Sequence, residues 1–451
     1  MFKCGFYEKD ITPALGSNIP GYAARREAED ILLPLYSKAI AIESNGKCVI
    51  IISIDAICMS NFIHDEAVKR ISEYTGVPSE CILIHATHTH TGGPIEAVKL
   101  KYPNPYFTGD EEYTKMLAKA VGDSGILAYK RLEPMKASYA KGNVEGLGFN
   151  RNYQMKDGSI RTNPGYKSPD IIKAIGKTDS DFPVILFYDE KGKEKGMLWN
   201  FTLHHDTTSS YETDRAICSD YSGALARLMK KKFGNDFISV FVNGACGNIN
   251  HLDVTQEPSV FYKEPFCFKV GEKLALELEE LIPRMKPFEI DVVDGCKEKL
   301  ELKRRVLSEE TIKEYEELYN TISLDGLKSD IAKPDSKEYK RSRAETFLNF
   351  AELPKTENMF IQALRIGDCM IYALPGEVYA EFGLLAKELS PLSFNMVAEL
   401  ANNGVRGSYV PTPETFGTEI YEAQITSAEF TEDAGEKMAR FAVELGKKLV
   451  D

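Results

Sequence analysis

CILIHATHTHTGGPIE (residues 81–96) is the stretch that decides the fold class. Its almost continuously apolar first part, residues 81–86, leads straight into a turn that contains His88 and His90. Apolar runs of this kind are typical of central strands that are covered on both faces. In α/β proteins, ligands bind and chemistry takes place at the carboxyl ends of such strands. We therefore expect an α/β protein whose functional site lies where this strand ends.

Short apolar runs alternate with longer amphipathic stretches along the rest of the chain. Strands are expected at 39–44, 48–57, 81–86, 136–144, 184–189, 196–203, 238–245, 288–302, 357–367, 369–376 and 395–400. Apolar residues at helical spacing predict helices at 62–76, 111–131, 222–234, 269–282, 377–389 and 427–449. The alternation predicts an α/β fold with mixed β-sheets and flanking helices.

Two polar regions interrupt this pattern. Residues 145–181 are rich in Gly, Asn, Asp, Lys and Ser, and we expect long loops there, with a short hairpin as an option. Residues 303–356 are strongly charged, which is typical of solvent-facing helices and favours a helical insertion. We find no sequence repeat and no Pro-rich linker, so residues 1–451 are expected to form a single domain.

Composition limits the partners of the protein. The chain has 451 residues and a formal net charge of −13, which argues against binding to nucleic acid or to an anionic membrane surface. Its nine cysteines are scattered without a C-x-x-C pair, and several lie in apolar runs. The first residues lack the apolar core of a signal peptide, and no apolar stretch approaches the roughly 18 residues of a membrane span. We expect a cytoplasmic protein that acts on a small molecule, without integral membrane association and in an oligomeric state that the sequence leaves open.

Histidine is scarce in this chain and concentrated near Gly-rich turns. Apart from His64, the histidines form three groups: His85, His88 and His90; His204 and His205; and His251. Histidine is the usual side chain for metal ligation and for proton transfer near neutral pH. The grouping therefore favours one metal or acid–base site, the alternative being polar turn residues around Thr87 and Thr89. If the chain stays extended beyond the strand, His88 and His90 point the same way; His85 is expected to pack in the core.

NFTLHHDTT (200–208) is a second apolar strand that ends in histidine. Neighbouring strand residues face opposite sides, so only one of His204 and His205 can join His88. Asp206 is a candidate to accept the spare ring N–H of a ligating histidine. For His205 and Asp206, an acid–base role and simple space filling remain equally open.

Two further turns carry polar residues. In FVNGACGNINHLD (241–253), a Gly-rich turn follows a strand; it could bind an oxyanion, although a tight turn also needs Gly for its own geometry. His251 is expected at the rim of the pocket or on the surface. In ALPGEVYAEF (373–382), Glu377 is expected to open a helix, where a carboxylate complements the helix dipole.

Together these motifs resemble the neutral/alkaline ceramidase family, in its N-terminal catalytic domain. HATHTHTGG (85–93) is similar to the family's ATHTHSGPGG, and NFTLHHDT to a family strand that ends in one ligating histidine. FVNGACGNIN corresponds to a strand and turn ending in GDVSP, and LPGE to the family's PGE. LANNGVRGSYVPTPE (400–414) resembles its tyrosine-containing loop, and Tyr421 follows Tyr409 at the family's distance. The matches keep the family's order from residue 10 to about 422.

The resemblance implies a catalytic site as well as a fold. It implies a Zn²⁺ ion bound by His88, His204, Glu377 and Tyr409. It also implies that His90 contacts the substrate or a ligand, that Arg151 binds polar substrate groups or the carboxylate product, and that Tyr421 helps to hold the oxyanion. In the mechanism that we expect, His90 transfers protons, Asn250 assists Tyr421 at the oxyanion, and Arg151 orients the substrate. Asn248, His205 and Asp206 are expected to contact the substrate. Two imidazoles, a carboxylate and a phenol are plausible zinc ligands that leave room for water.

The chain also departs from the family pattern. Where the ceramidases have GDVS, this chain has GNIN, so Asn248 replaces Asp and Asn250 replaces the serine proposed to attack the amide. Asparagine is not a conventional nucleophile, and we expect attack on an amide bond by water activated by zinc. An immunoglobulin-like C-terminal domain and a secretion signal are also expected to be absent, which argues against ceramide as the substrate.

Two alternatives remain open. One is a zinc-dependent glycan- or ester-processing hydrolase, for which SSYETD (209–214) and NRNYQ (150–154) would supply polar loops. The other is a catalytically inactive protein that binds a ligand in a zinc pocket, motivated by the loss of the serine.

Overall fold

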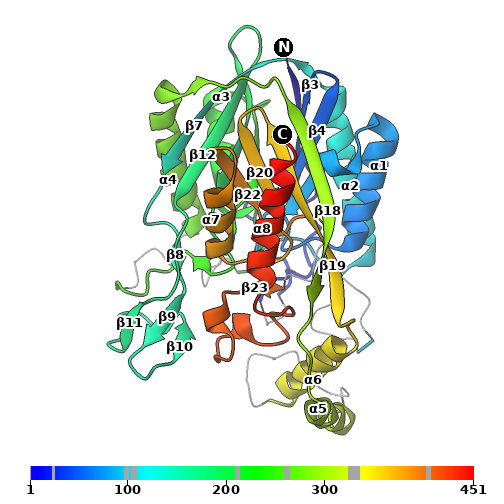
Figure 1. Cartoon of the computed structure of the whole chain (residues 1–451), viewed down its shortest axis with the longest axis vertical. Coiled ribbons are helices and arrows are strands. Elements are labelled where there is room, and N and C mark those ends of the chain that lie inside the picture. Colours follow the sequence, from blue (N-terminus) through cyan, green and yellow to red (C-terminus); the bar gives the residue numbers. More distant parts are fainter. Residues whose placement is uncertain are drawn as a thin grey trace.

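Three mixed β-sheets form the centre of the protein, and pairs of helices cover them (Figure 1). The computed structural model describes residues 2–22, 26–95, 101–102, 109–208, 214–257, 265–323, 336–402 and 408–450. Within these residues the predicted α/β class with mixed sheets is confirmed.

The first sheet has the strand order β5-β4-β3-β1-β6. Its strands are β5 (Ile82–Ala86), β4 (Lys47–Ile54), β3 (Tyr36–Ser44), β1 (Lys3–Asp10) and β6 (Glu133–Pro134). Only β4 and β5 run parallel, and α1 (Asn61–Thr75) connects them. The next helix, α2 (Glu111–Lys130), packs against α1, β1 and β3.

The second sheet has the order β15-β13-β12-β7-β17. Its strands are β15 (Ile238–Asn243), β13 (Glu194–Phe201), β12 (Asp181–Tyr188), β7 (Lys136–Asn143) and β17 (Lys286–Pro287). Its one parallel pair, β13 and β15, is connected by α3 (Asp220–Phe233), against which α4 (Phe266–Leu281) packs.

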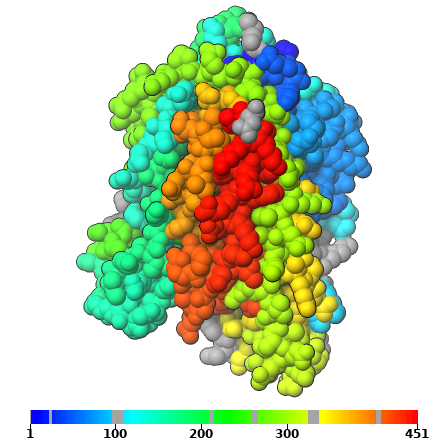
Figure 2. Space-filling model, viewed as in Figure 1, coloured from blue at the N-terminus to red at the C-terminus, as the bar shows by residue number. Residues whose placement is uncertain are grey.

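The third sheet has the order β18-β19-β20-β22. Its strands are β18 (Val293–Lys303), β19 (Thr356–Ile366), β20 (Cys369–Ala373) and β22 (Phe394–Ala398). The parallel pair β20 and β22 is connected by α7 (Ala380–Leu389), which packs against α8 (Ala434–Lys447). These two helices lie side by side, α7 in orange and α8 in red, on the face shown in Figure 2.

One plan is thus used three times, although the sequence shows no repeat. In each unit, antiparallel strands lead into a β-α-β connection whose last strand is the sheet edge, and a second helix follows. Long parallel connections of this kind are normally made by a helix. The repetition cannot be seen in the sequence, because the three units share their topology and their pattern of buried positions but not their residues. Many different apolar residues can fill such positions.

The three edge strands β5, β15 and β22 meet in the interior. Asn402 N donates to Ile84 O at 2.8 Å, and Glu399 N donates to Asn243 O at 3.0 Å. His85 Nε2 lies 3.0 Å from Phe241 O, which links β5 to β15. The loops that follow these strands are therefore brought together, although they come from distant parts of the chain.

Some local predictions were wrong. In residues 145–181, β9 (Asn152–Met155) and β10 (Ile160–Thr162) form the hairpin that was given as an option, but β11 (Ile171–Ala174), which completes a three-stranded sheet, was not expected. Glu377 does not open a helix. It lies in the short strand β21 (Glu377–Val378), parallel to β23 (Tyr409–Val410), and α7 begins three residues later.

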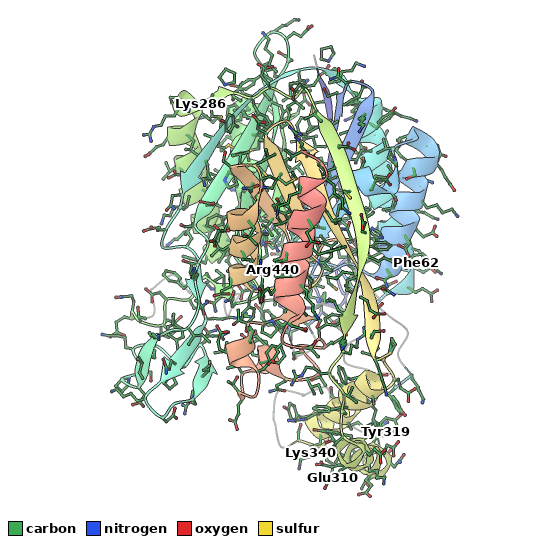
Figure 3. The ribbon with its side chains drawn as sticks, in the orientation of Figure 1. Phe62, Lys286, Glu310, Tyr319, Lys340 and Arg440 are labelled. Carbon is green, nitrogen blue, oxygen red and sulfur yellow. The ribbon has the colours of Figure 1, made fainter. Side chains whose placement is uncertain are left out.

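The charged region 303–356 contains two helices between the adjacent strands β18 and β19. They are α5 (Glu309–Thr321) and α6 (Lys337–Ala351); residues 324–335 lie outside the described part of the chain. The pair, which we call the α5–α6 arm, extends from the end of the molecule opposite the chain termini (Figure 1). Figure 3 shows Glu310, Tyr319 and Lys340 on it.

The other elements are short. They are β2 (Asp30–Ile31), β8 (Phe149–Asn150), β14 (Ala216–Ile217), β16 (Ile249–Asn250) and the 3-10 turns Ser79–Cys81, Ile282–Arg284, Pro413–Thr415 and Tyr421–Ala423. β16 pairs with β8, which places the turn after β15 beside Arg151.

Candidate metal and catalytic site

The segments that follow β5, β13 and β20 bring three predicted ligands together. The atoms His88 Nε2 and His204 Nε2 are 3.0 Å apart. Glu377 Oε2 lies 3.2 Å from His88 Nε2 and 3.7 Å from His204 Nε2. One residue from each of the three units thus contributes to a single cluster, and all three side chains are buried.

His88 enters the cluster through a left-handed turn. Its φ is +71°, a region that residues other than glycine rarely adopt and that is often found at functional sites. His88 N donates to Ala56 O at 2.9 Å, and His88 Nδ1 donates to Ile57 O at 2.6 Å. The chain therefore does not stay extended beyond β5, which was the condition for His88 and His90 to point the same way; a turn bonded to the residues after β4 brings the two rings together instead.

His204, and not His205, joins His88. His204 Nδ1 donates to the carbonyl of Cys246 at 3.0 Å. The ring of His205 packs in the core, with its centroid 4.0 Å from that of Tyr221 and 4.9 Å from that of Phe241. The predicted substrate contact by His205 is thus wrong, because strand alternation turns this fully buried side chain away from the cluster and it fills space.

The hydrogen bonds of His88 and His204 set their tautomers. A carbonyl can only accept, so each Nδ1 carries a proton, and in the neutral ring each Nε2 presents a lone pair. Two such lone pairs 3.0 Å apart, facing a carboxylate oxygen, need a proton or a cation between them. Among the described residues, no group donates a hydrogen bond to the buried Glu377 Oε2. This donor set fits a divalent metal that prefers nitrogen and oxygen ligands.

The pKa values of His88 and Tyr409 also indicate that the cluster favours a positive charge. Burial disfavours a charged His88 ring, but the neighbouring Glu377 carboxylate outweighs it and raises the pKa of His88 to about 9. Burial, followed by the charge of Glu377, raises the pKa of the Tyr409 phenol well above its usual value. Phenol ligation is therefore reasonable only beside a cation.

His90 lies in the same cluster. Its Nε2 is 3.4 Å from His88 Nε2, and the rings of His88, His90 and His204 together could hold an ion. Tyr22 covers His90 with ring centroids 4.9 Å apart, and Arg26 donates to the His90 carbonyl at 2.6 Å. Sequence reasoning missed Arg26, because a single arginine in a polar segment has no distinguishing pattern.

Arg151, Tyr409 and Tyr421 form an adjoining group. The Arg151 guanidinium lies 5.5 Å from the Tyr409 ring centroid and 5.3 Å from that of Tyr421, and the two phenol oxygens are 3.5 Å apart. Arg151 is held by Glu422 Oε1 at 2.9 Å and by the Gly247 carbonyl at 2.7 Å. Tyr409 is paired with Glu377 across β21 and β23, which links this group to the cluster.

The two asparagines of the GNIN turn form hydrogen bonds to other residues of the protein. Asn248 Oδ1 accepts from Ala380 N at 2.9 Å and its Nδ2 donates to Glu381 Oε2 at 2.9 Å, so it caps the start of α7. Each polar atom of Asn248 thus has a partner at the start of α7, and its contact with substrate stays a prediction. Asn250 Oδ1 accepts from Leu252 N at 3.1 Å, and its Nδ2 donates to Asn163 Oδ1 at 3.2 Å.

Asp206 does not take the orienting role that the sequence suggested, because the Cys246 carbonyl occupies the spare nitrogen of His204. Asp206 Oδ1 instead lies 3.1 Å from His251 Nδ1, and both side chains are partly accessible. His85 packs in the core as predicted. Of the polar segment 209–214, only Asp214 lies within the described residues.

Glu399 is a further buried carboxylate, at the end of β22, that sequence reasoning missed. It accepts hydrogen bonds from Cys246 N and Val378 N, at 3.0 and 3.1 Å. Burial raises its pKa to about 8. Its partners lie far away in the sequence, so no local signal could have marked it.

These features define a class: an α/β protein with a buried histidine–carboxylate cluster at the ends of its strands. The family model described as neutral/alkaline non-lysosomal ceramidase, N-terminal, matches residues 2–272. Because this match covers more than half of the chain, the protein belongs to that family, and the resemblance seen in the sequence is confirmed.

Known relatives agree with this assignment. The neutral ceramidase of Oryza sativa subsp. japonica is 28% identical over 228 residues, which are 49% of this chain and 28% of the rice protein. The chain thus matches less than a third of that relative's length.

Solved ceramidase structures share the fold. The neutral ceramidase from Pseudomonas aeruginosa superimposes with a TM-score of 0.71 at 18% identity, over 99% of this chain and 74% of that one. A ceramidase complexed with C2 gives 0.72 at 17% identity, over 100% and 75%. At such identities the likeness establishes the fold alone. Among the described helices, none combines the length and the apolar character needed to cross a bilayer.

Proposed function

We propose that this protein is a zinc-dependent hydrolase that cleaves an amide bond in a small molecule other than ceramide. The observation that carries the proposal is the convergence of His88 Nε2, His204 Nε2 and Glu377 Oε2 within 3.7 Å, without a hydrogen-bond donor to Glu377 Oε2 among the described residues. Family membership supports hydrolysis of an amide.

His88, His204 and Glu377 would hold the metal, with Tyr409 as the fourth ligand. His90, in the same cluster, is the alternative to Tyr409. A zinc ion supplies Lewis acidity and lowers the pKa of water to about 7. The Nδ1–H groups of His88 and His204, held by the carbonyls of Ile57 and Cys246, keep both rings oriented toward the ion.

The remaining side chains supply proton transfer and charge stabilisation. His90 can move a proton through Nδ1, to which no described residue offers a hydrogen bond. The Tyr421 hydroxyl, on a side chain that is 44% exposed, can donate to the oxyanion that develops on the substrate carbonyl. Arg151, fixed by Glu422, attracts and orients a polar or anionic group of the substrate.

The residue Asn250 supports a substrate other than ceramide. It stands where the family resemblance expects a serine, and its amide is bound to Leu252 N and Asn163. The chain therefore offers no hydroxyl nucleophile at this place, and water is the attacking group. Asn250 keeps one N–H that can assist Tyr421 at the oxyanion.

Hydrolysis assays test this function. The metal-loaded protein should hydrolyse at least one member of a panel of short N-acyl amides, with little activity on long-chain ceramide. A chelator should abolish the activity, and added Zn²⁺ should restore it. Hydrolysis of esters or glycosides but not amides would contradict the amide assignment. Zinc binding without any hydrolysis would contradict catalysis and favour a binding protein.

A further inference from the structure

We infer that Glu399 is a positioning residue for the proposed metal site, holding the segments that orient His204 and Glu377. The inference rests on the proposed function, because it concerns how this chain arranges ligands for a metal. Glu399 lies at the end of β22, outside the set of side chains that would touch the ion.

Every polar contact of the Glu399 carboxylate goes to a segment from another part of the chain. Oε2 accepts from Cys246 N at 3.0 Å and from Val378 N at 3.1 Å. Oε1 accepts from Asn243 Nδ2 at 3.1 Å and from the Cys246 thiol at 2.8 Å. With no exposed surface, this carboxyl group has its hydrogen-bonding capacity used entirely by the protein.

The first contact leads to His204. Cys246 donates its backbone N–H to Glu399, and its carbonyl accepts the Nδ1–H of His204 at 3.0 Å. The position of this carbonyl sets the tautomer and the direction of the His204 ring. A shift of Cys246 would therefore turn the lone pair of His204 Nε2 away from the cluster.

The second contact leads to Glu377. Val378 N belongs to the residue directly after Glu377, in the two-residue strand β21. The bond to Glu399 adds to the backbone hydrogen bonds around this strand, which run from Glu377 N to Ser408 O, from Gly247 N to Val378 O and from Tyr379 N to Val410 O. One carboxyl oxygen thus links the backbones beside two ligands that come from different sheets.

Substitutions at position 399 separate the two backbone contacts from the two side-chain contacts. Glu399→Gln keeps an oxygen that can accept from both backbone N–H groups, but its NH2 group cannot accept from Asn243 Nδ2 and the Cys246 thiol as Oε1 does. Glu399→Asp keeps the charge but is one methylene shorter and cannot reach both donors. Glu399→Ala removes every contact. Glu345→Gln, at an equally buried glutamate in α6, is the matched control.

The experiment is a chelator competition that measures Zn²⁺ affinity, with thermal unfolding of each metal-free variant measured in parallel. We expect the affinity to fall tenfold or more in Glu399→Ala and Glu399→Asp, the size of effect seen when partners of metal ligands are removed. Glu399→Gln should stay within about threefold of wild type, and Glu345→Gln should match wild type.

Two outcomes overturn the inference alone: wild-type affinity in folded Glu399→Asp, or a larger loss in Glu399→Gln than in Glu399→Asp, which would show that reach to the two backbone N–H groups does not decide the affinity. If Glu399→Ala does not fold, the Zn²⁺ affinities of Glu399→Asp and Glu399→Gln still test the inference. A wild-type protein that binds no Zn²⁺ overturns the proposed function, and this inference with it.

Discussion

The strand ends that form the site and the α5–α6 arm use buried charge in opposite ways. Each contains a glutamate with no exposed surface, Glu399 in one and Glu345 in the other. Glu345 pairs with Arg341 one turn away in the same helix, at 2.9 Å. Glu399 and Glu377 instead receive their neighbours from segments far away in the chain. The charge of Glu345 is balanced by an arginine of the same helix, whereas Glu377 Oε2 faces two histidine nitrogens from other sheets, an arrangement that favours a bound cation.

The largest effect should come from removing a ligand. His204→Ala should abolish bound metal and lower hydrolysis by at least about a thousandfold, because only three of the four proposed ligands, His88, Glu377 and Tyr409, then remain. Elemental analysis and amide hydrolysis check this. The matched variant is His205→Phe, which keeps a ring between Tyr221 and Phe241 and should retain metal. Loss of metal from both variants would contradict the different roles of the two histidines.

Breaking the charge pair of the arm should destabilise the protein without touching the site. Arg341→Ala leaves the buried Glu345 carboxylate unpaired, which should cost on the order of 3 kcal/mol in the stability of the arm. Limited proteolysis within the arm would report this loss, while zinc content should equal that of wild type. A fall in zinc content in step with the loss of the arm would show that the two regions are coupled.

The core histidine His85 predicts a dependence of stability on pH. Burial lowers the pKa of His85 to about 4, below the usual 6.5 of an unfolded chain, so the folded state favours the neutral ring. The stabilisation is present above pH 6.5 and is lost as the pH falls toward 4. Between pH 7 and pH 5, wild type should lose about 2 kcal/mol more than His85→Gln. The free energy of unfolding is measured by chemical denaturation at both pH values. An equal loss in wild type and His85→Gln would contradict this prediction.

The smallest effect is expected from removing the arm entirely. Lys303 and Thr356 are paired at the base of β18 and β19, so a short Gly-containing turn can replace residues 304–355. Arg304 donates to Glu429 Oε2 and Arg305 donates to the Ala423 carbonyl, so some loss of stability is expected. Zinc affinity should stay within about twofold of wild type, measured by chelator competition. A tenfold loss would place part of the site in the arm.

Much of the fold was predictable because apolar runs and helical periodicity mark the strands and helices. The strand β1 was missed because KCGFYEKD is short of β-branched residues and contains Gly5. That glycine is required by packing, since a Cβ there would meet the Ala128 carbonyl of α2 at 2.2 Å. The three-unit plan depends on contacts between distant segments, which no local pattern carries.

The site was predictable where residue type alone signals chemistry. The clustered histidines pointed to His88 and His204, and strand alternation indicated that only one of His204 and His205 would join them. The bond from Ala380 N to Asn248 could not be predicted, because it appears only once α7 is in place. Glu399 could not be found, since a glutamate at a strand end has no distinctive sequence signal.

The most direct test of the central claim is the metal content of the purified wild-type protein beside His88→Ala and His204→Ala, measured by elemental analysis after supply of Zn²⁺ and removal of excess. The convergence of three lone-pair donors predicts close to one zinc per chain in wild type and almost none in either variant. A wild-type protein that binds no metal would contradict the account, and the cluster would then have to be held together by a proton shared among His88, His204 and Glu377.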